Sequence, residues 1–438
     1  MNNIELLKFP YPFQAALAIC SDIDSTSWDN FLTIHKFLNS NQKTALGRGL
    51  SLPVGDSFWM YDKEGNANAA FSYFKDFKGR KSKNAPAIRD LIRAGIIDVL
   101  HSYGNFTSPQ DFSRKLALQA IEELDKYGLK LKVWTNHGGV ESVQNIGAFS
   151  SGKGEILNEP SDLNEKNISP YYHSDLLSEY GIKFYWDCEL SLTGIVGQNR
   201  KSKWSEAYWG SPLYKGFKNK SKSVTKGIIS LLDNGYNKIS HKHFIPWQPI
   251  DFQNALIQNE KLRDGTPIFR FKRFGNGRLD WQDDFSDLLS DKVLKRLLEK
   301  HGYLILYIHL GDRKNKNDNL PLGKAVVDRF RDLAELFFSE RVWIGTTSRI
   351  LTYNLVNQNL DWQYSDTDSK YVININGINK FSSFFSPSID DFQGISFKIP
   401  ANKQVEVFFN EQKINPKIVK KSTYQIAMFP LIPIEWPL

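Results

Sequence analysis

The stretch from Ala15 to Ser25, with the sequence AALAICSDIDS, most strongly limits how this chain can fold. A short continuous apolar run bounded by polar residues is typical of a buried strand in a parallel sheet. The run leads into Asp22 and Asp24, whose side chains point the same way on an extended backbone. Two carboxylates that converge at the end of a buried strand repel each other, which favours a cation or a proton between them. The alternative is that the pair only caps the strand or the following helix.

The rest of the chain indicates an α/β fold. Apolar strand-like runs alternate with amphipathic stretches for about 350 residues, which is typical of βα units around a parallel sheet or barrel. We therefore predict a (β/α) barrel of seven or eight strands in residues 1–364. From residue 365, β-forming residues between turns predict a small antiparallel β domain that covers 365–438. The expected barrel strands are 15–20, 50–54, 96–100, 129–134, 182–186, 267–271, 303–308 and 342–345, and 190–238 is expected to be an irregular insertion.

Charge and cysteine content limit the partners and the compartment. The 56 basic and 48 acidic side chains give a net charge of +8, and much of the excess lies in runs at 75–83, 215–226 and 413–421. Such runs can attract an anionic glycan, a phosphorylated lipid carrier or a membrane surface, and solvated loops are the alternative. No nucleic-acid recognition motif accompanies them, so no nucleic-acid partner is expected. The two cysteines, the absence of a signal-like N-terminus and the absence of a bilayer-length apolar run predict a cytoplasmic protein without an integral membrane segment.

Polar residues follow several of the predicted strands directly. In a βα barrel the carboxyl ends of the strands form one rim, so these side chains are expected to converge on one pocket. Carboxylates, imidazoles and an amide together suit a divalent cation such as Zn²⁺ with an open position for water. For each histidine, the alternative to metal binding or catalysis is a structural role at the strand end. The residues concerned are Asp22, Asp24, His101, Asn136, His137, Asp187 and His309.

The order of these residues resembles the polysaccharide deacetylase (NodB-like) superfamily, in its divergent branch linked to bacterial surface-glycan biosynthesis. That family has a first strand that ends in paired aspartates, a His-Ser-x-x-His motif, a Gly-x-x-x-x-x-Trp-Asp strand and a late apolar strand that ends in histidine. The similar segments here are 21–24 (SDID), 101–105 (HSYGN), 180–187 (YGIKFYWD) and 306–309 (LYIH), and the resemblance covers roughly residues 10–355.

The resemblance implies a metal-dependent hydrolase that removes an acyl group, usually acetyl, from a sugar or polysaccharide. It implies Asp24 and His101 as metal ligands, Asp22 as the general base and His309 as the general acid. The family's aspartates are adjacent, whereas Ile23 separates them here, so the two carboxylate roles can be exchanged. The implied cofactor is a divalent metal, most simply Zn²⁺, and the implied partner is a carbohydrate that can be anionic or lipid-linked.

Two positions depart from the family pattern. Asn105 stands where the second motif has its other histidine, and either Asn105 or His137 can complete the metal site. The family's arginine-containing third motif is absent from its expected place, where 135–138 read TNHG.

Four further residues are candidates for contact with substrate. Trp186 can stack on a sugar ring, with core packing as its alternative, and Asp187 follows the same strand. Arg270 and Arg273 can each bind a carboxylate or phosphate through a planar guanidinium, with a solvated side chain as the alternative. A glycosidase that uses Asp187 with one of the first aspartates, and a sugar-binding protein without catalysis, are the competing functions.

Overall fold

The computed structural model of the chain describes residues 4–438 except 64, 67, 107–110, 139–141, 147–169, 189, 192–216, 241–253, 263, 276–279 and 314–318. It has a mixed α/β fold with several sheets, as the sequence predicted. Within these ranges no helix combines the length and the apolar character that are needed to cross a bilayer.

Strand β2 (Ala15–Ser21) lies inside a five-stranded sheet and is buried along its whole length. It pairs in parallel with β14 (Tyr303–Ile308) on one side and β15 (Val342–Ile344) on the other. The sheet continues from β14 through β13 (Arg273–Phe274) to β10 (Leu190–Ser191). Because both edges and both faces of β2 are covered, its sequence is apolar throughout rather than alternating.

A seven-stranded sheet supplies the other wall of this α/β region, in the order β11–β12–β9–β8–β7–β5–β6. Its neighbouring strands are parallel except for the pair β11 and β12. The strands are β5 (Asp56–Tyr61), β6 (Ser72–Phe74), β7 (Ile97–His101), β8 (Val133–Thr135), β9 (Phe184–Trp186), β11 (Ile257–Lys261) and β12 (Pro267–Phe271).

One segment connects the two sheets. β12 pairs with β9 of the seven-stranded sheet, and one residue later β13 pairs with β14 of the five-stranded sheet. On the other side β2 and β5 contact each other, but among the described residues no pairing joins these two strands. The described strands therefore form two parallel-rich sheets that share a connecting strand, and the closed barrel stays a prediction.

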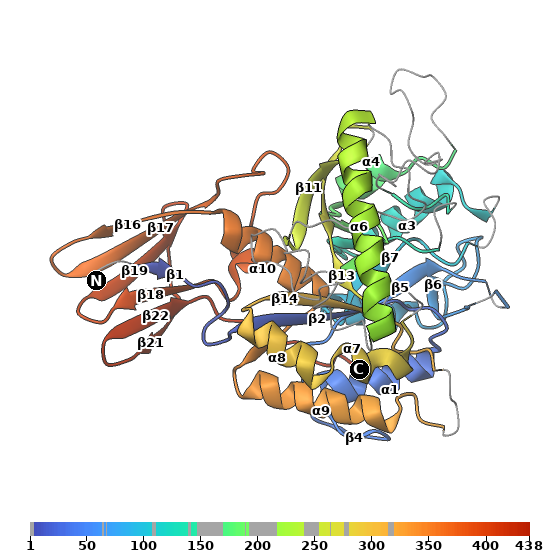
Figure 1. The fold of residues 1–438 in the computed structure, drawn as a ribbon, viewed down its shortest axis with the longest axis horizontal. Coiled ribbons are helices and arrows are strands. Elements are labelled where there is room, and N and C mark those ends of the chain that lie inside the picture. The colour runs from blue at the N-terminus through green and yellow to red at the C-terminus, as the bar shows by residue number, and fades with distance from the viewer. Residues whose placement is uncertain are drawn as a thin grey trace.

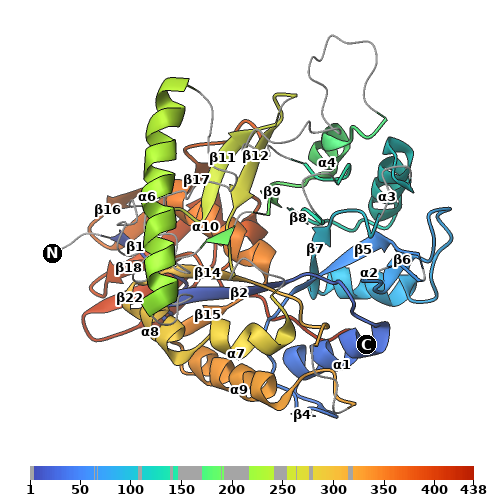
Figure 2. The same cartoon turned by 45° about the vertical axis from the view of Figure 1, so that its right-hand side comes forward.

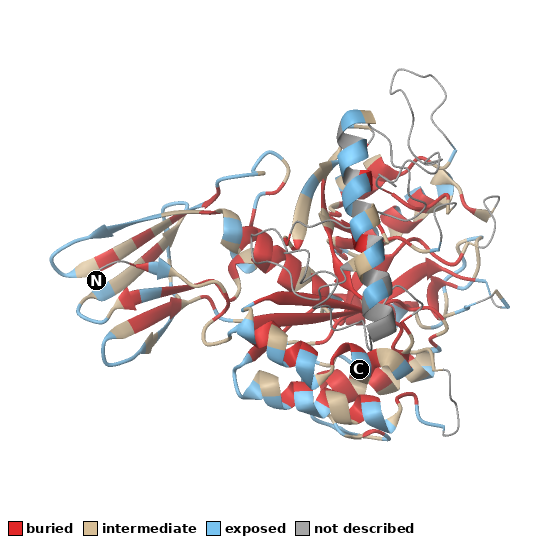
Figure 3. Ribbon diagram, viewed as in Figure 1, coloured by how far each residue is buried: buried red, intermediate tan, exposed pale blue. Residues whose placement is uncertain are grey.

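The helices cover the outer faces of the sheets, with α1, α7 and α9 on one side and α3 and α4 on another (Figure 2). Ser27 and Thr346 cap the first turns of α1 and α10 by accepting a hydrogen bond from a backbone N–H. Figure 3 shows that the buried residues concentrate in the strands and on the inward helix faces. The helices are α1 (Trp28–Asn39), α2 (Ala85–Arg93), α3 (Arg114–Lys126), α4 (Ser174–Tyr180), α6 (Phe217–Ser240), α7 (Phe285–Leu288), α8 (Asp291–Glu299), α9 (Lys324–Phe338) and α10 (Thr347–Asn359), with the 3₁₀ turns η2 (Gln282–Asp284) and η3 (Ile389–Phe392).

Two predictions about local structure were wrong. The second strand was expected at 50–54 but is β5, at Asp56–Tyr61, because Pro53 has no N–H to donate to a ladder. The expected irregular insertion at 190–238 contains the 24-residue helix α6 in its described part. Ser and Lys dominate the first half of α6 and obscured the helical pattern of its apolar residues. In the second half, the apolar side chain of Leu232 is 64% exposed.

The C-terminal region forms two small sheets that lie apart from the parallel sheets in Figure 1. One has the order β16–β17–β19–β20 and contains a parallel pair, β17 with β19, so it is not purely antiparallel as predicted. The other, antiparallel throughout, is β1–β18–β22–β21, and its strand β1 comes from the N-terminus. The strands are β1 (Glu5–Leu6), β16 (Leu360–Asp366), β17 (Lys370–Ile378), β18 (Ser396–Pro400), β19 (Gln404–Phe409), β20 (Gln412–Ile414), β21 (Lys417–Lys420) and β22 (Tyr424–Met428); a separate hairpin joins β3 (Lys43–Thr44) and β4 (Gly47–Arg48).

Candidate functional site

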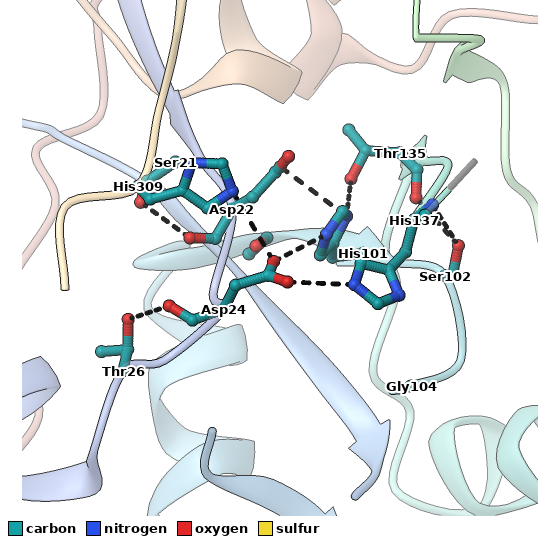
Figure 4. Close-up of polar contacts among 12 residues, drawn as sticks. Ser21, Asp22, Asp24, Thr26, His101, Ser102, Gly104, Thr135, His137 and His309 are labelled. Atoms are coloured by element: carbon teal, nitrogen blue, oxygen red, sulfur yellow. Dashed lines mark hydrogen bonds and ion pairs between the residues drawn. The ribbon is translucent and has the colours of Figure 1, made fainter. Parts of the chain in front are cut away.

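Five of the predicted site residues lie close together at the carboxyl ends of parallel strands (Figure 4). Asp22 and Asp24 follow β2, and His101 is the last residue of β7. His137 comes two residues after β8, and His309 comes directly after β14. Their convergence follows from the parallel pairing, which brings the carboxyl ends of neighbouring strands to one edge.

Asp24 is the centre of this cluster. Its two carboxylate oxygens face different imidazoles: Oδ2 lies 3.1 Å from His101 Nε2, and Oδ1 lies 3.0 Å from His137 Nε2. His309 Nε2 lies 3.9 Å from Asp24 Oδ2. Burial by itself raises the pKa of Asp24, but His137 and His101 outweigh it and hold this pKa well below its usual value. Conversely, Asp24 outweighs burial at His137 and raises the pKa of that imidazole.

Asp24, His101 and His137 together form a group that can hold a metal ion. One ligand atom from each lies within 4.8 Å of the other two. One carboxylate and two imidazoles are a donor set that suits Zn²⁺ and leaves a position open for water. His137 thus completes this candidate group. Asn105 is buried and its backbone carbonyl accepts a hydrogen bond from Asn66, and its role as a ligand stays a prediction.

The surrounding residues fix the ring of His101 and the backbone of His137. His101 Nδ1 lies 2.7 Å from Thr135 Oγ1, so the hydroxyl fixes the ring while Nε2 faces Asp24. Metal-binding histidines usually have such a partner on the second nitrogen. The backbone N–H of His137 donates to Ser102 Oγ at 3.0 Å and to Asn145 Oδ1 at 3.1 Å. These contacts are consistent with a preorganised metal site.

The loop after β7 approaches its neighbours too closely for a side chain at Gly104. A Cβ atom there would lie 2.1 Å from the backbone oxygen of Tyr61. The side chain of Gln144 forms two hydrogen bonds with the same loop: it accepts one from the Tyr103 N–H and donates one to the Gly104 carbonyl. His173 in turn contacts the Gln144 carbonyl through Nε2 at 3.0 Å. This chain of contacts fixes the loop that follows His101.

Asp22 is paired with Arg273, which the sequence analysis considered only as a contact for substrate. Arg273 binds it with two hydrogen bonds, Nη1 to Oδ1 at 2.7 Å and Nη2 to Oδ2 at 2.9 Å. Both side chains are buried, and His101 Nδ1 lies 3.6 Å from Asp22 Oδ1. Burial raises the pKa of Asp22, but Arg273 and then His101 outweigh it and bring this pKa below its usual value. Asp22 is therefore ionised at neutral pH.

Two aromatic rings hold the guanidinium of Arg273 in place. Its carbon lies 3.4 Å from the ring centre of Trp186 and 4.3 Å from that of Tyr307. Trp186, expected to stack on a sugar, thus stacks on Arg273. Arg273, expected to bind an anionic group of the substrate or to be solvated, binds Asp22 instead.

The other two expected substrate contacts pair with each other. Arg270 Nη1 lies 2.9 Å from Asp187 Oδ2, and Arg270 Nε lies 2.8 Å from Glu260 Oε1. Asp187 is buried and Arg270 is partly buried. Contact of either residue with a substrate stays a prediction.

His309 presents one nitrogen to the cluster and uses the other for anchoring. Nδ1 lies 3.2 Å from the backbone carbonyl of Asp280, which only a protonated Nδ1 can satisfy by donation. Nε2 is the nitrogen on the Asp24 side. The backbone N–H of His309 donates to the same carbonyl at 2.8 Å, so this contact fixes both the backbone and the ring.

Comparison with protein families and with curated proteins gives no match for this chain. No protein-family model matches it, and no curated protein is detectably similar to it. The function must therefore be argued from the residues of the site.

Proposed function

We propose that this protein is a metal-dependent hydrolase that removes an acyl group, most simply acetyl, from an amine or hydroxyl of a sugar. The observation that carries the proposal is the separation of two carboxylates into two environments. Asp24 faces two imidazoles, whereas Asp22, two residues away, faces Arg273 and His101. One carboxylate can then bind a cation while the other accepts a proton.

Asp24, His101 and His137 would hold the metal, for which Zn²⁺ is the simplest choice. When bound, such an ion polarises a carbonyl oxygen and lowers the pKa of a water molecule toward neutrality. The chain's own contribution begins with Asp22, which stays ionised because of Arg273 and can accept the proton of an attacking water. His309 can donate a proton from Nε2 to the leaving amine or alcohol, since its Nδ1 is occupied by the Asp280 carbonyl.

A glycosidase is less well supported by the same residues. It would need one carboxyl group that stays protonated as an acid beside a second, ionised one. Arg273 holds the pKa of Asp22 below its usual value, and Arg270 binds the carboxylate of Asp187, so neither carboxyl group is placed as a proton donor to a sugar. The acyl hydrolase needs only one ionised carboxylate as base, and it assigns the acid to His309.

The fold that we propose for this function is an open β/α barrel. The two parallel-rich sheets share the segment from β12 to β13, and β2 contacts β5 at the other junction. The site residues sit at the carboxyl ends of β2, β7, β8 and β14, which is where barrel enzymes place their chemistry.

Metal content measured by elemental mass spectrometry tests the proposal directly. We expect near-stoichiometric metal in the wild type and its loss in both His101→Ala and His137→Ala. Asn105→Ala tests the competing ligand, and His301→Ala, an exposed histidine that follows α8, is the matched control. A metal-loaded wild type is then assayed for acetate release from acetylated amino sugars, with Asp22→Asn as the inactive variant that keeps the metal. Absence of metal from the wild type after addition of Zn²⁺ would contradict the proposal.

A further inference from the structure

We propose a second binding site, for an anionic saccharide, in a cleft between the N-terminal segment and the C-terminal sheet of β1, β18, β22 and β21. The cleft has a volume of about 490 Å³. It forms where residues 7–14 run from β1 to β2, past the residues that follow α8, as the trace between these strands shows in Figure 1. The residues that carry the argument are Lys8, Phe9, Tyr11, Phe13, Lys398 and Tyr424, which we call the N-terminal cleft.

The N-terminal cleft is separate from the cluster around Asp24. It includes Phe13 and Gln14, which precede β2, whereas Asp22 follows the opposite end of this seven-residue strand. A saccharide bound here would therefore contact the protein away from the reacting residues. The inference goes beyond the proposed hydrolase function and does not depend on it.

The charge of the cleft selects an anion. Two lysines and His301 are among its lining residues, and none of the described lining residues is acidic. The outward face of the adjoining sheet extends this charge, because the strand register places Lys398 and Lys417 on the same face. On this face, Glu5 of β1 lies opposite Lys398 of β18. Among the described strands of the sheet, Glu5 is the acidic residue that this face carries. The lysine run at 413–421 thus contributes to a surface that continues from the cleft.

The aromatic rings of the cleft select a sugar over a simple anion. Tyr11, Phe13 and Tyr424 are each partly exposed, so part of each ring is available beside the lysines. Lys398 Nζ lies 5.1 Å from the ring centre of Tyr424, and Lys8 Nζ lies 5.3 Å from that of Phe9. A sugar ring with a carboxylate or phosphate presents an apolar face beside a negative charge, which this pairing of ring and ammonium complements.

Lys8 is held in position for this role. Its Nζ donates to the backbone carbonyl of His301 at 2.5 Å, and an ammonium group has three donors, so two remain for a ligand. The Tyr303 hydroxyl donates to the Lys8 carbonyl at 2.9 Å, which fixes the backbone of the segment at the cleft.

Calorimetric titration of the full-length protein with tetragalacturonate tests the site. We expect the wild type to bind this acidic tetrasaccharide at least about tenfold more tightly than neutral cellotetraose, a difference of about 1.4 kcal/mol. Lys398→Glu and Tyr424→Ala should each weaken binding by about tenfold. Lys295→Glu on α8, whose side chain is 77% exposed, makes the same charge change elsewhere and should leave binding unchanged.

Several results would overturn the inference. Undetectable binding by the wild type, equal binding of cellotetraose, or full affinity in Lys398→Glu would each contradict a saccharide site in this cleft. Displacement of tetragalacturonate by an equal concentration of inorganic phosphate would indicate an unspecific anion site instead. Because Lys398 is exposed, its variant tests the site even where Tyr424→Ala fails to fold. Titrating Asp24→Ala, which lacks a metal ligand, separates this outcome from that of the hydrolase proposal, since binding should persist there.

Discussion

Replacing Arg273 with methionine should both destabilise the protein and change how its stability depends on pH. The guanidinium and the carboxylate of Asp22 are buried, and they make two hydrogen bonds of 2.7 and 2.9 Å. Removing one partner of a buried pair leaves an uncompensated charge, which typically costs about 3–5 kcal/mol. We therefore expect the free energy of unfolding of metal-free Arg273→Met to fall by about this amount at neutral pH.

The pH dependence gives the sharper test. In the wild type the folded-state pKa of Asp22 is lowered, so the stability from this pair is present above the unfolded-state pKa of about 4 and is lost as pH falls through the folded pKa. Without Arg273, burial raises that pKa instead. The loss of stability in Arg273→Met should then grow as pH rises above about 4, by up to about 1.4 kcal/mol per unit.

Urea unfolding followed by tryptophan fluorescence, in the presence of a chelator, measures these differences without a contribution from metal binding. Asp22→Asn combined with Arg273→Met should recover about 2 kcal/mol or more of the loss, because no buried charge remains. Arg93→Met is the matched control, since Arg93 pairs with Asp90 on the surface and should change stability by about 0.5 kcal/mol or less. A loss in Arg273→Met of under about 1 kcal/mol, or strict additivity in the double variant, would refute the reasoning.

Three further predictions concern groups near the site or beneath the sheet. Burial raises the pKa of Asp98 to about 6, so ionisation of this group lowers the free energy of unfolding as pH rises from about 4 to 6. In the same urea assay, Asp98→Asn should stabilise the protein by about 3 kcal/mol at pH 7.5 and hardly at all at pH 4. Burial lowers the pKa of His173 to about 3, so the wild type should lose stability below about pH 6.5 by up to about 1.4 kcal/mol per pH unit. The stability of His173→Gln should depend less steeply on pH in this range, and an unchanged slope of stability against pH would contradict the prediction. Thr135→Val removes the hydroxyl 2.7 Å from His101 Nδ1 and should weaken Zn²⁺ binding about 10–100-fold in a competition titration, whereas Thr135→Ser should bind almost normally.

The sequence predicted the class of fold because burial leaves a direct trace in residue type. The run 15–20 is apolar throughout because β2 is paired on both sides, and 303–308 reads the same way for the same reason. The wrong strand at 50–54 shows the limit of this signal. Leu52 and Val54 are buried but do not belong to a strand. Apolar content alone does not distinguish a buried loop from a buried strand.

The candidate site was predictable to the extent that its residues directly follow apolar strands. Asp24, His101 and His137 came together because parallel strands end at the same edge. The pairing of Arg273 with Asp22 was not predicted because the two residues are 251 positions apart and the strand of Arg273 is only two residues long. The choice between Asn105 and His137 could not be made from the chain order, since it depends on which loop turns its side chain toward Asp24.

The short passage from β12 to β13 makes this part of the chain intolerant of insertions and deletions. Within four residues, Arg270 neutralises Asp187 beside one sheet and Arg273 neutralises Asp22 beside the other, with Lys272 between them. Adding or removing one residue would place Lys272 or Phe274 opposite Asp22, and neither offers the planar, two-pronged guanidinium. Homologues that preserve the chemistry should therefore vary in length at their surface loops but keep a constant spacing between these two arginines.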